Sequence, residues 1–89
     1  MVTVFLRHTI SDYPKWRKVY DAAADLKKSG GVLAEAVYQS ADDPNDVTVT
    51  HEFATLDAAR TYLAREDLKE AIKEAGVIGA PTVWYTNQV

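Results

Sequence analysis

The stretch VTVTHEFATLDAAR, from Val47 to Arg60, begins with the pattern of a β-strand and ends with that of a helix. β-Branched residues alternate with other residues as far as Phe53, which is typical of a strand with one buried face. By this period of two, Val49, His51 and Phe53 share a face. The stretch therefore predicts a strand that leads directly into a helix and carries an imidazole on its apolar side.

The sequence on either side of this stretch completes a β-α-β-β-α-β order. Helices are predicted where apolar residues recur three or four positions apart, between a cap at Ser11 or Asp12 and the stop at Gly30, and from Thr55 or Asp57 onwards to Gly76. Strands are predicted at residues 2–8, 32–40, 47–53 and 82–86, with a turn at 41–46 and a connector at 79–81. This order is the ferredoxin-like split unit, an α+β fold whose antiparallel sheet carries helices on one face.

The size of the chain predicts one domain, residues 1–89, that needs a partner. A domain of this length buries only about 60% of the surface of its unfolded chain. Because the second face of the sheet has no helices, we expect a second copy to cover it, giving a homodimer of the dimeric α/β-barrel type. Arg7 and Glu52 fall on that face and are expected to form a cross-strand ion pair.

Composition and charge exclude several classes of function. The net charge of −3 and the pI near 5.2 argue against binding nucleic acid. The absence of cysteine excludes disulfides and thiolate sites. Two histidines alone are a weak metal signal, and the Asp42, Asp43 and Asp46 cluster is explained as a turn around Pro44, so no metal is expected. No apolar run of about 18 residues or signal peptide is visible, and we expect a cytoplasmic protein that does not enter a membrane.

Three segments together resemble the small dimeric α/β-barrel proteins of the antibiotic biosynthesis monooxygenase type. They are RHTISDYPKWRKVYDA, ADDPNDVTVTHEFATLDAARTYLAREDLKEAIKEAGV and APTVWY, and they cover nearly the whole chain. The shared features are a histidine after the first strand, a D-Y-x-x-W helix start, an aspartate- and proline-containing turn and the strand-to-helix junction quoted above. The superfamily includes cofactor-free oxygenases, polyketide cyclases, haem-degrading enzymes and proteins without a known reaction.

The resemblance implies a small-molecule site between the sheet and the helices of the same subunit. Phe53 matches the aromatic residue that looks into this space in members with known sites. Family members usually have a bulky apolar residue where this chain has His51, which makes His51 the most informative departure. Haem-degrading relatives ligate iron through a histidine on the second helical segment, where Ile72 stands here, so we expect no haem and no other cofactor.

His51 and His8 are the candidate catalytic residues. An imidazole in an apolar cavity can act as a general base, because its pKa lies near the working pH. The alternative for His51 is a neutral ring that is hydrogen-bonded to a neighbour, and for His8 a capping or loop contact. Both residues lie on the apolar sides of strands that are adjacent in this fold, so both could face one cavity.

Five aromatic residues are candidates for contact with a small hydrophobic or aromatic ligand, although each could equally belong to the core. The set is Phe53, Trp16, Tyr20, Tyr62 and Tyr85. With the two histidines they predict a cofactor-independent enzyme that removes a proton from an aromatic or polyketide-like molecule, either as a monooxygenase or as a cyclase. The alternative is a non-catalytic binding or stress-response barrel whose interior is filled by these aromatics.

Overall fold

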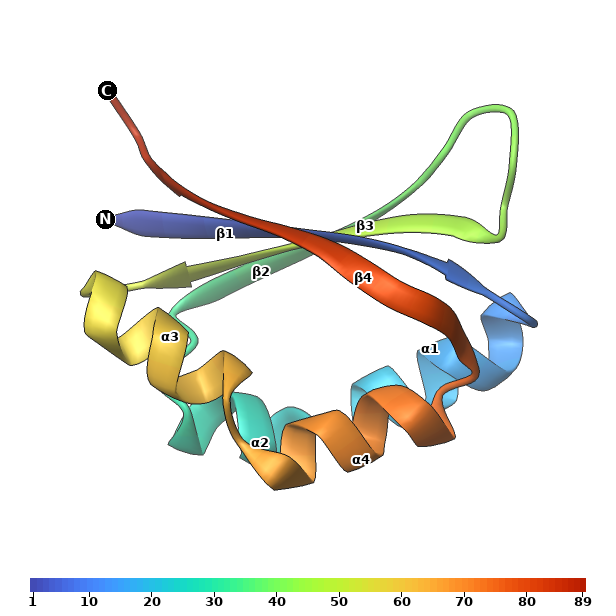
Figure 1. The fold of residues 1–89 in the computed structure, drawn as a ribbon, viewed down its shortest axis with the longest axis horizontal. Helices are drawn as coiled ribbons and strands as arrows, with labels where there is room; N and C mark the ends of the chain where they lie inside the picture. Colours follow the sequence, from blue (N-terminus) through green and yellow to red (C-terminus); the bar gives the residue numbers. More distant parts are fainter.

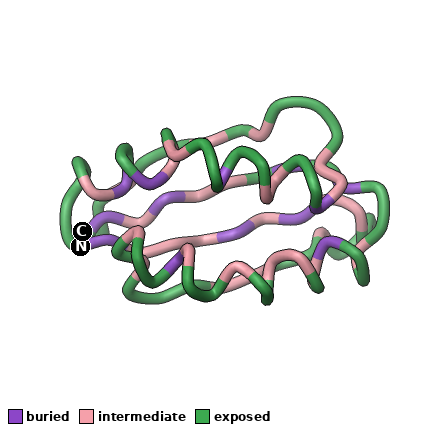
Figure 2. The backbone as a smooth tube through the Cα atoms, turned by 90° about the horizontal axis from the view of Figure 1, so that it is seen from below, coloured by how far each residue is buried: buried purple, intermediate pink, exposed green.

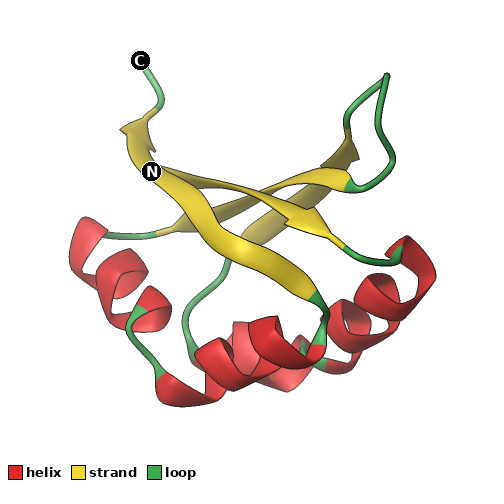
Figure 3. Cartoon of the chain, turned by 45° about the vertical axis from the view of Figure 1, so that its right-hand side comes forward, coloured by secondary structure: helices red, strands yellow, loops and turns green.

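The computed structural model describes residues 1–89 and has the predicted ferredoxin-like α+β fold. Four antiparallel strands lie in the order β2-β3-β1-β4, and the helices cover one face of the sheet (Figures 1 and 3). The elements are β1 (Val2–Ile10), α1 (Tyr13–Ala22), α2 (Ala24–Ser29), β2 (Ala34–Gln39), β3 (Asp46–Phe53), α3 (Leu56–Leu63), α4 (Glu66–Glu74) and β4 (Val77–Asn87).

Two side-chain caps fix where the two helical regions begin. The Asp12 carboxylate accepts a hydrogen bond from the Lys15 N–H at 3.1 Å, and Pro14 lies in the first turn of α1. The Thr55 hydroxyl accepts from the Ala58 N–H at 3.1 Å and starts α3. Such caps satisfy N–H groups that have no partner within the helix. Each of the two helical regions therefore starts where the sequence predicts it.

The predicted face of β3 is confirmed. Val47, Val49 and Phe53 are 0–4% exposed and pack toward the helices, whereas their neighbours in the strand face away. Figure 2 shows the same alternation of buried and less buried residues along the central strands. The buried residues form two clusters, one around Phe53 and Tyr62 and the other around Trp16 and Val49.

The last strand differs from the prediction. The predicted strand at 82–86 and the connector at 79–81 are both parts of β4, which runs from Val77 to Asn87. The glycine and proline of the connector are tolerated because β4 pairs irregularly with β1 between Arg7 and Thr9, and Gly79 takes a φ of 73° there. The prediction was wrong because it took turn-forming residues as a connector before the strand rather than as an irregularity within it.

Five other expectations are corrected. The first strand does not end at His8 but continues to Ile10, and the second strand is Ala34–Gln39 rather than 32–40. The first helical region is divided at Ala23, where the N–H bonds to the carbonyl of Tyr20, three residues back. Since alanine favours helix, local propensity does not cause this break.

The remaining two corrections concern side chains. The helical spacing of apolar residues after Thr55 predicts that Leu56 points inward, but Leu56 is 38% exposed at the start of α3. Arg7 does not pair with Glu52, because Glu52 lies opposite Thr3 in the register and Arg7 lies opposite Thr48. Arg7 instead forms a two-pronged ion pair with Asp46, at 2.5 and 2.9 Å.

Candidate functional site

A small apolar cavity lies between the sheet and the helices. Its volume is about 70 Å³, and 12 of its 15 lining residues are hydrophobic. Side chains from β1, β3 and all four helices contribute to it, so the two central strands and the helices together form its wall. The lining residues are Leu6, His8, Trp16, Val19, Tyr20, Ala23, Lys27, Val49, His51, Tyr62, Leu63, Leu68, Ala71, Ile72 and Ala75.

His51 stands in the wall of this cavity among aromatic rings. Its ring lies 6.2 Å from that of Tyr20 in a stacked arrangement, and 5.9 Å from that of Tyr62 edge to face. Burial lowers the pKa of His51 to about 4, although the Glu35 carboxylate opposes the effect. The imidazole is therefore neutral at neutral pH and keeps a lone pair for accepting a proton.

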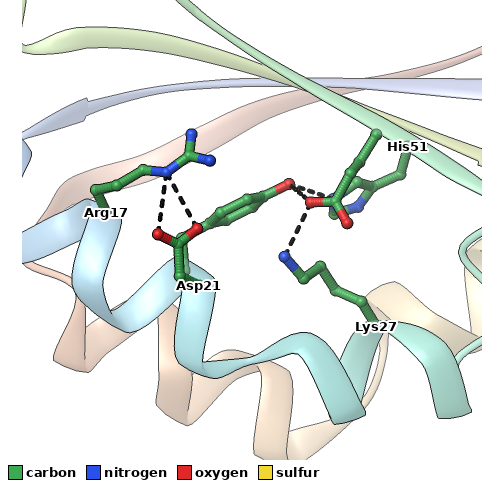
Figure 4. A network of polar contacts seen from close by, with 6 residues as sticks. Arg17, Asp21, Lys27 and His51 are labelled. Atoms are coloured by element: carbon green, nitrogen blue, oxygen red, sulfur yellow. Dashed lines mark hydrogen bonds and ion pairs between the residues drawn. The ribbon is translucent and has the colours of Figure 1, made fainter.

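Tyr20 connects His51 to a network of polar contacts (Figure 4). The Tyr20 hydroxyl donates to the Glu35 carboxylate and lies 3.2 Å from His51 Nε2. Lys27 Nζ donates to the same Glu35 oxygen at 2.9 Å and lies 3.6 Å from the centre of the Tyr20 ring. Two side chains thus donate to one carboxylate at the side of an otherwise apolar cavity, and one of them, Tyr20, also contacts His51.

This network fixes which nitrogen of His51 carries the proton. Partial burial raises the pKa of Glu35, but the hydrogen bonds from Tyr20 and Lys27 outweigh it and hold the pKa below its usual range, so Glu35 is ionised. Burial and the bond to Glu35 raise the pKa of Tyr20, so its hydroxyl keeps its single proton. Because Tyr20 gives that proton to Glu35, the contact with His51 requires an Nε2–H donor. The free lone pair of His51 is then on Nδ1, which has no partner within the protein.

His8 lines the same cavity near its other end. It is 6% exposed, neither ring nitrogen has a hydrogen-bond partner, and burial lowers its pKa despite the nearby charge of Asp46. His8 lies opposite Val47 whereas His51 lies opposite Val4, which places the two histidines roughly 13 Å apart along the strands. They share a cavity but do not touch, and the stacked rings of Trp16 and Tyr20 lie between them.

The five candidate aromatics occupy three different settings. Trp16, Tyr20 and Tyr62 line the cavity, and burial raises the pKa of Tyr62 to about 12. Phe53 is 0% exposed and lies edge-on to His51, 6.4 Å away, in the packed core beside the cavity. Tyr85 is 39% exposed on β4, under the guanidinium of Arg60, and does not line the cavity.

Sequence reasoning missed Lys27 and Glu35. A signal for Lys27 exists, since it follows Val19 and Ala23 at steps of four and so continues the buried stripe of the helical region. Glu35 lies directly opposite His51 in the β2–β3 register. Its role could have been found only by fixing that register from the hairpin turn.

No group of three or more histidine, aspartate or glutamate side chains is placed to hold a metal ion. The longest helix has ten residues, and none combines the length and apolar character that a membrane crossing needs.

Comparison with known proteins identifies solved structures of the same shape. No family model and no curated protein matches the sequence. An antibiotic biosynthesis monooxygenase superposes with a TM-score of 0.76 at 17% identity, covering 100% of this chain and 99% of that one. SnoaB, a cofactor-independent oxygenase from Streptomyces nogalater, superposes with a TM-score of 0.75 at 18% identity over 99% of this chain and 94% of SnoaB.

A candidate antibiotic biosynthesis monooxygenase from Bordetella bronchiseptica gives a TM-score of 0.83 at 16% identity, over 99% of this chain and 96% of that one. The chain has the fold of these proteins. The match extends over both chains almost completely.

Proposed function

We propose that the protein is a cofactor-independent enzyme that removes a proton from a small phenolic or enolisable molecule and lets the resulting anion react with oxygen. The observation that carries the proposal is the free Nδ1 of a neutral His51 in the wall of an apolar cavity. Apolar pockets with a few convergent polar groups are where small molecules bind, and shifted pKa values mark sites of proton transfer. The oxygenase SnoaB has the same fold, which supports the choice of reaction.

The reaction balances without any redox group on the protein. A C–H proton that is acidified by the ring passes to His51 Nδ1, and the carbanion adds O₂ at carbon. The peroxide anion takes the proton back from His51, and the hydroperoxide loses water to leave a carbonyl. A CH₂ group and O₂ thus become C=O and H₂O. The protein supplies the base, the apolar walls and the exclusion of bulk water.

The low pKa of His51 sets a limit on the substrate. A phenol with a pKa near 10 is about six pKa units less acidic than the protonated form of His51, whose pKa is about 4. Proton transfer from the phenol to His51 is therefore about 8 kcal/mol uphill. A turnover of about one per second corresponds to a barrier of about 17 kcal/mol, which leaves room for this step. Acidic phenols and activated methylenes are therefore the preferred substrates.

The volume of the cavity favours oxygenation over cyclisation. At about 70 Å³ it is half the size of the ~150 Å³ cavity that holds benzene in an engineered protein. A long polyketide chain would not fold inside it, and even one ring requires its walls to move apart. The same volume favours a second candidate function, in which the protein is a non-catalytic binding or stress-response barrel.

We also propose that the protein acts as a homodimer joined through the open face of the sheet. Phe5 and Trp84 stack on this face with ring centres 5.6 Å apart, and Trp84 is 41% exposed. Tyr38, paired with Thr48 on the same face, is 58% exposed. Large exposed aromatics on a helix-free sheet are typical of a surface that another subunit covers.

The test is oxygen uptake by the purified protein with phenols and with cyclic ketones that carry an activated methylene, without added flavin or metal. We expect uptake above the rate in buffer for at least one compound, and a loss of about 100-fold or more in His51→Phe, the size of effect expected for a general base. Lys69→Met, at an exposed position of α4, serves as the matched control. Uptake no faster than buffer with every compound would instead support the non-catalytic barrel.

A further inference from the structure

Lys27 is a charged side chain in a place where lysine is seldom found. It is 6% exposed, although a lysine stem normally lets the ammonium reach water. Among the residues that line the cavity it is the one with a full charge, because both histidines there are held neutral. Figure 4 shows Lys27 reaching from α2 toward the network that contains His51. The Lys27 side chain is therefore part of the wall of the same apolar space as the base.

The ion pair that holds Lys27 is asymmetric with respect to the cavity. The Glu35 side chain is 40% exposed and does not line the cavity, whereas the Lys27 side chain is 8% exposed and does. The Glu35 oxygen that meets Lys27 also accepts from Tyr20, so its hydrogen-bonding capacity is largely used. A ligand inside the cavity thus meets the ammonium end of the pair and not the carboxylate end.

The Lys27 ammonium also has more N–H donors than it has acceptors in the protein. It has three N–H donors, and its one protein acceptor is Glu35. The Tyr20 ring, 3.6 Å from Nζ, covers a second side of the group. Burying a charge only for stability gives little net gain, since desolvation offsets the attraction of the pair. A remaining donor that faces an apolar cavity is suited to an anionic oxygen.

We propose that Lys27 is the anion-binding residue of the cavity, and that the ligand is an aromatic molecule bound through a phenolate or enolate oxygen. The inference rests on the proposed function and names its substrate class. An opposite charge within about 4–6 Å lowers the pKa of an acid by one to three units. Binding at Lys27 therefore acidifies the substrate by about ten- to a thousand-fold and compensates for the weak basicity of His51.

The proposal is tested by binding alone, with 4-nitrophenol and its uncharged analogue nitrobenzene as probes. The absorption of 4-nitrophenolate reports the ionisation of the bound molecule, and calorimetry gives the Kd of both compounds. We expect the wild type to bind 4-nitrophenolate at least ten-fold more tightly than nitrobenzene and to lower the pKa of bound nitrophenol by one unit or more. Lys27→Met should remove both effects while changing the Kd of nitrobenzene less than three-fold.

Two further variants keep the test decisive if Lys27→Met does not fold. Lys27→Arg keeps the charge and should keep the preference for the phenolate. Glu35→Gln keeps the acceptor for Tyr20 but removes the counter-charge, so the preference should increase. Equal affinity for the two probes in the wild type, no binding of either at millimolar concentration, or a preference unchanged in Lys27→Met and Glu35→Gln would overturn the proposal. A phenolate preference without oxygen uptake would leave this site standing and remove the oxygenase function.

Discussion

At the scale of single residues, the structure explains how a histidine is tolerated inside an apolar layer. An unpaired polar group in such a place costs about 1–3 kcal/mol. His51 avoids part of this cost because Tyr20 accepts from Nε2, and Tyr20 in turn donates to Glu35. The arrangement leaves one nitrogen without a partner, which is the feature that a merely structural histidine does not need.

The stability of the protein should fall as the pH is lowered from 6.5 to 4. Burial lowers the pKa of His51 from its ordinary value of 6.5 to about 4, so in this window the unfolded chain binds a proton that the folded chain does not. The free energy of unfolding therefore has its full value above pH 6.5 and decreases as the pH falls to about 4. At about 1.4 kcal/mol per pKa unit the loss is about 3 kcal/mol. Urea unfolding at pH 7 and pH 4.5 measures it.

His51→Phe is the matched variant for this measurement. The variant lacks the titrating group, so the difference in its free energy of unfolding between pH 7 and pH 4.5 should be smaller by about 2–3 kcal/mol. His8, whose pKa is also lowered, keeps a part of the pH dependence in both proteins. An equal pH dependence in the two proteins would show that His51 is not held neutral by burial.

The sequence predicts the position of His51 but not its surroundings. Strand alternation alone places His51 on the face of Val49, and the structure has it there. Lys27 continues the buried stripe of the helical region, but Glu35 joins His51 through a strand register that no local pattern specifies. Alternation likewise does not show that Phe53 packs into the core beside the cavity rather than lining it.

At the scale of elements, the helix caps predict the structure correctly, whereas the glycine and proline near the last strand do not. Asp12 and Thr55 start helices where the sequence predicts, because their side chains bond the first free N–H groups. Gly79 and Pro81 do not end a strand, because an irregular pairing with β1 accommodates them. Turn residues thus predict a local distortion of β4. Whether β4 continues to pair through the distortion depends on its partner strand β1.

The end of α2 packs so closely on α3 that one methyl group should disturb it. A Cβ at Gly30 would lie 2.0 Å from a ring carbon of Tyr62, which is 1% exposed, while the φ of Gly30 is an ordinary −82°. Gly30→Ala should therefore lower the free energy of unfolding by about 1–3 kcal/mol through overpacking. Because Tyr62 also lines the cavity, the variant should weaken ligand binding as well.

Gly31→Ala separates packing from backbone strain in this test. Gly31 has a φ of 86° but open space around its Cα, so its substitution costs only the strain of a left-handed residue, about 1 kcal/mol. Thermal unfolding of both variants gives the comparison. Equal stability of Gly30→Ala and the wild type would mean that α2 and α3 are not packed as described.

At the scale of the whole molecule, the open face of the sheet should hold two copies together. We expect a dimer by sedimentation velocity at micromolar concentration, since a small domain gains from covering Phe5, Tyr38 and Trp84. Trp84→Glu should shift the protein toward monomer by placing a charge in this face. Leu56→Glu, at a residue on α3 with nearly equal exposure, 38% against 41%, should leave the dimer intact. A monomeric wild type would contradict the proposed assembly.

The proposed chemistry depends on a neutral His51 that carries its proton on Nε2 and leaves Nδ1 without a protein partner. The most direct measurement is nitrogen NMR of the histidine side chains of the ¹⁵N-labelled protein, titrated from pH 7 to pH 4, with His51→Phe used to assign the signals. We expect the Nε2–H tautomer of neutral His51 at pH 7, with protonation only as the pH approaches about 4. An imidazolium at pH 7, or a neutral ring with its proton on Nδ1, would contradict the account.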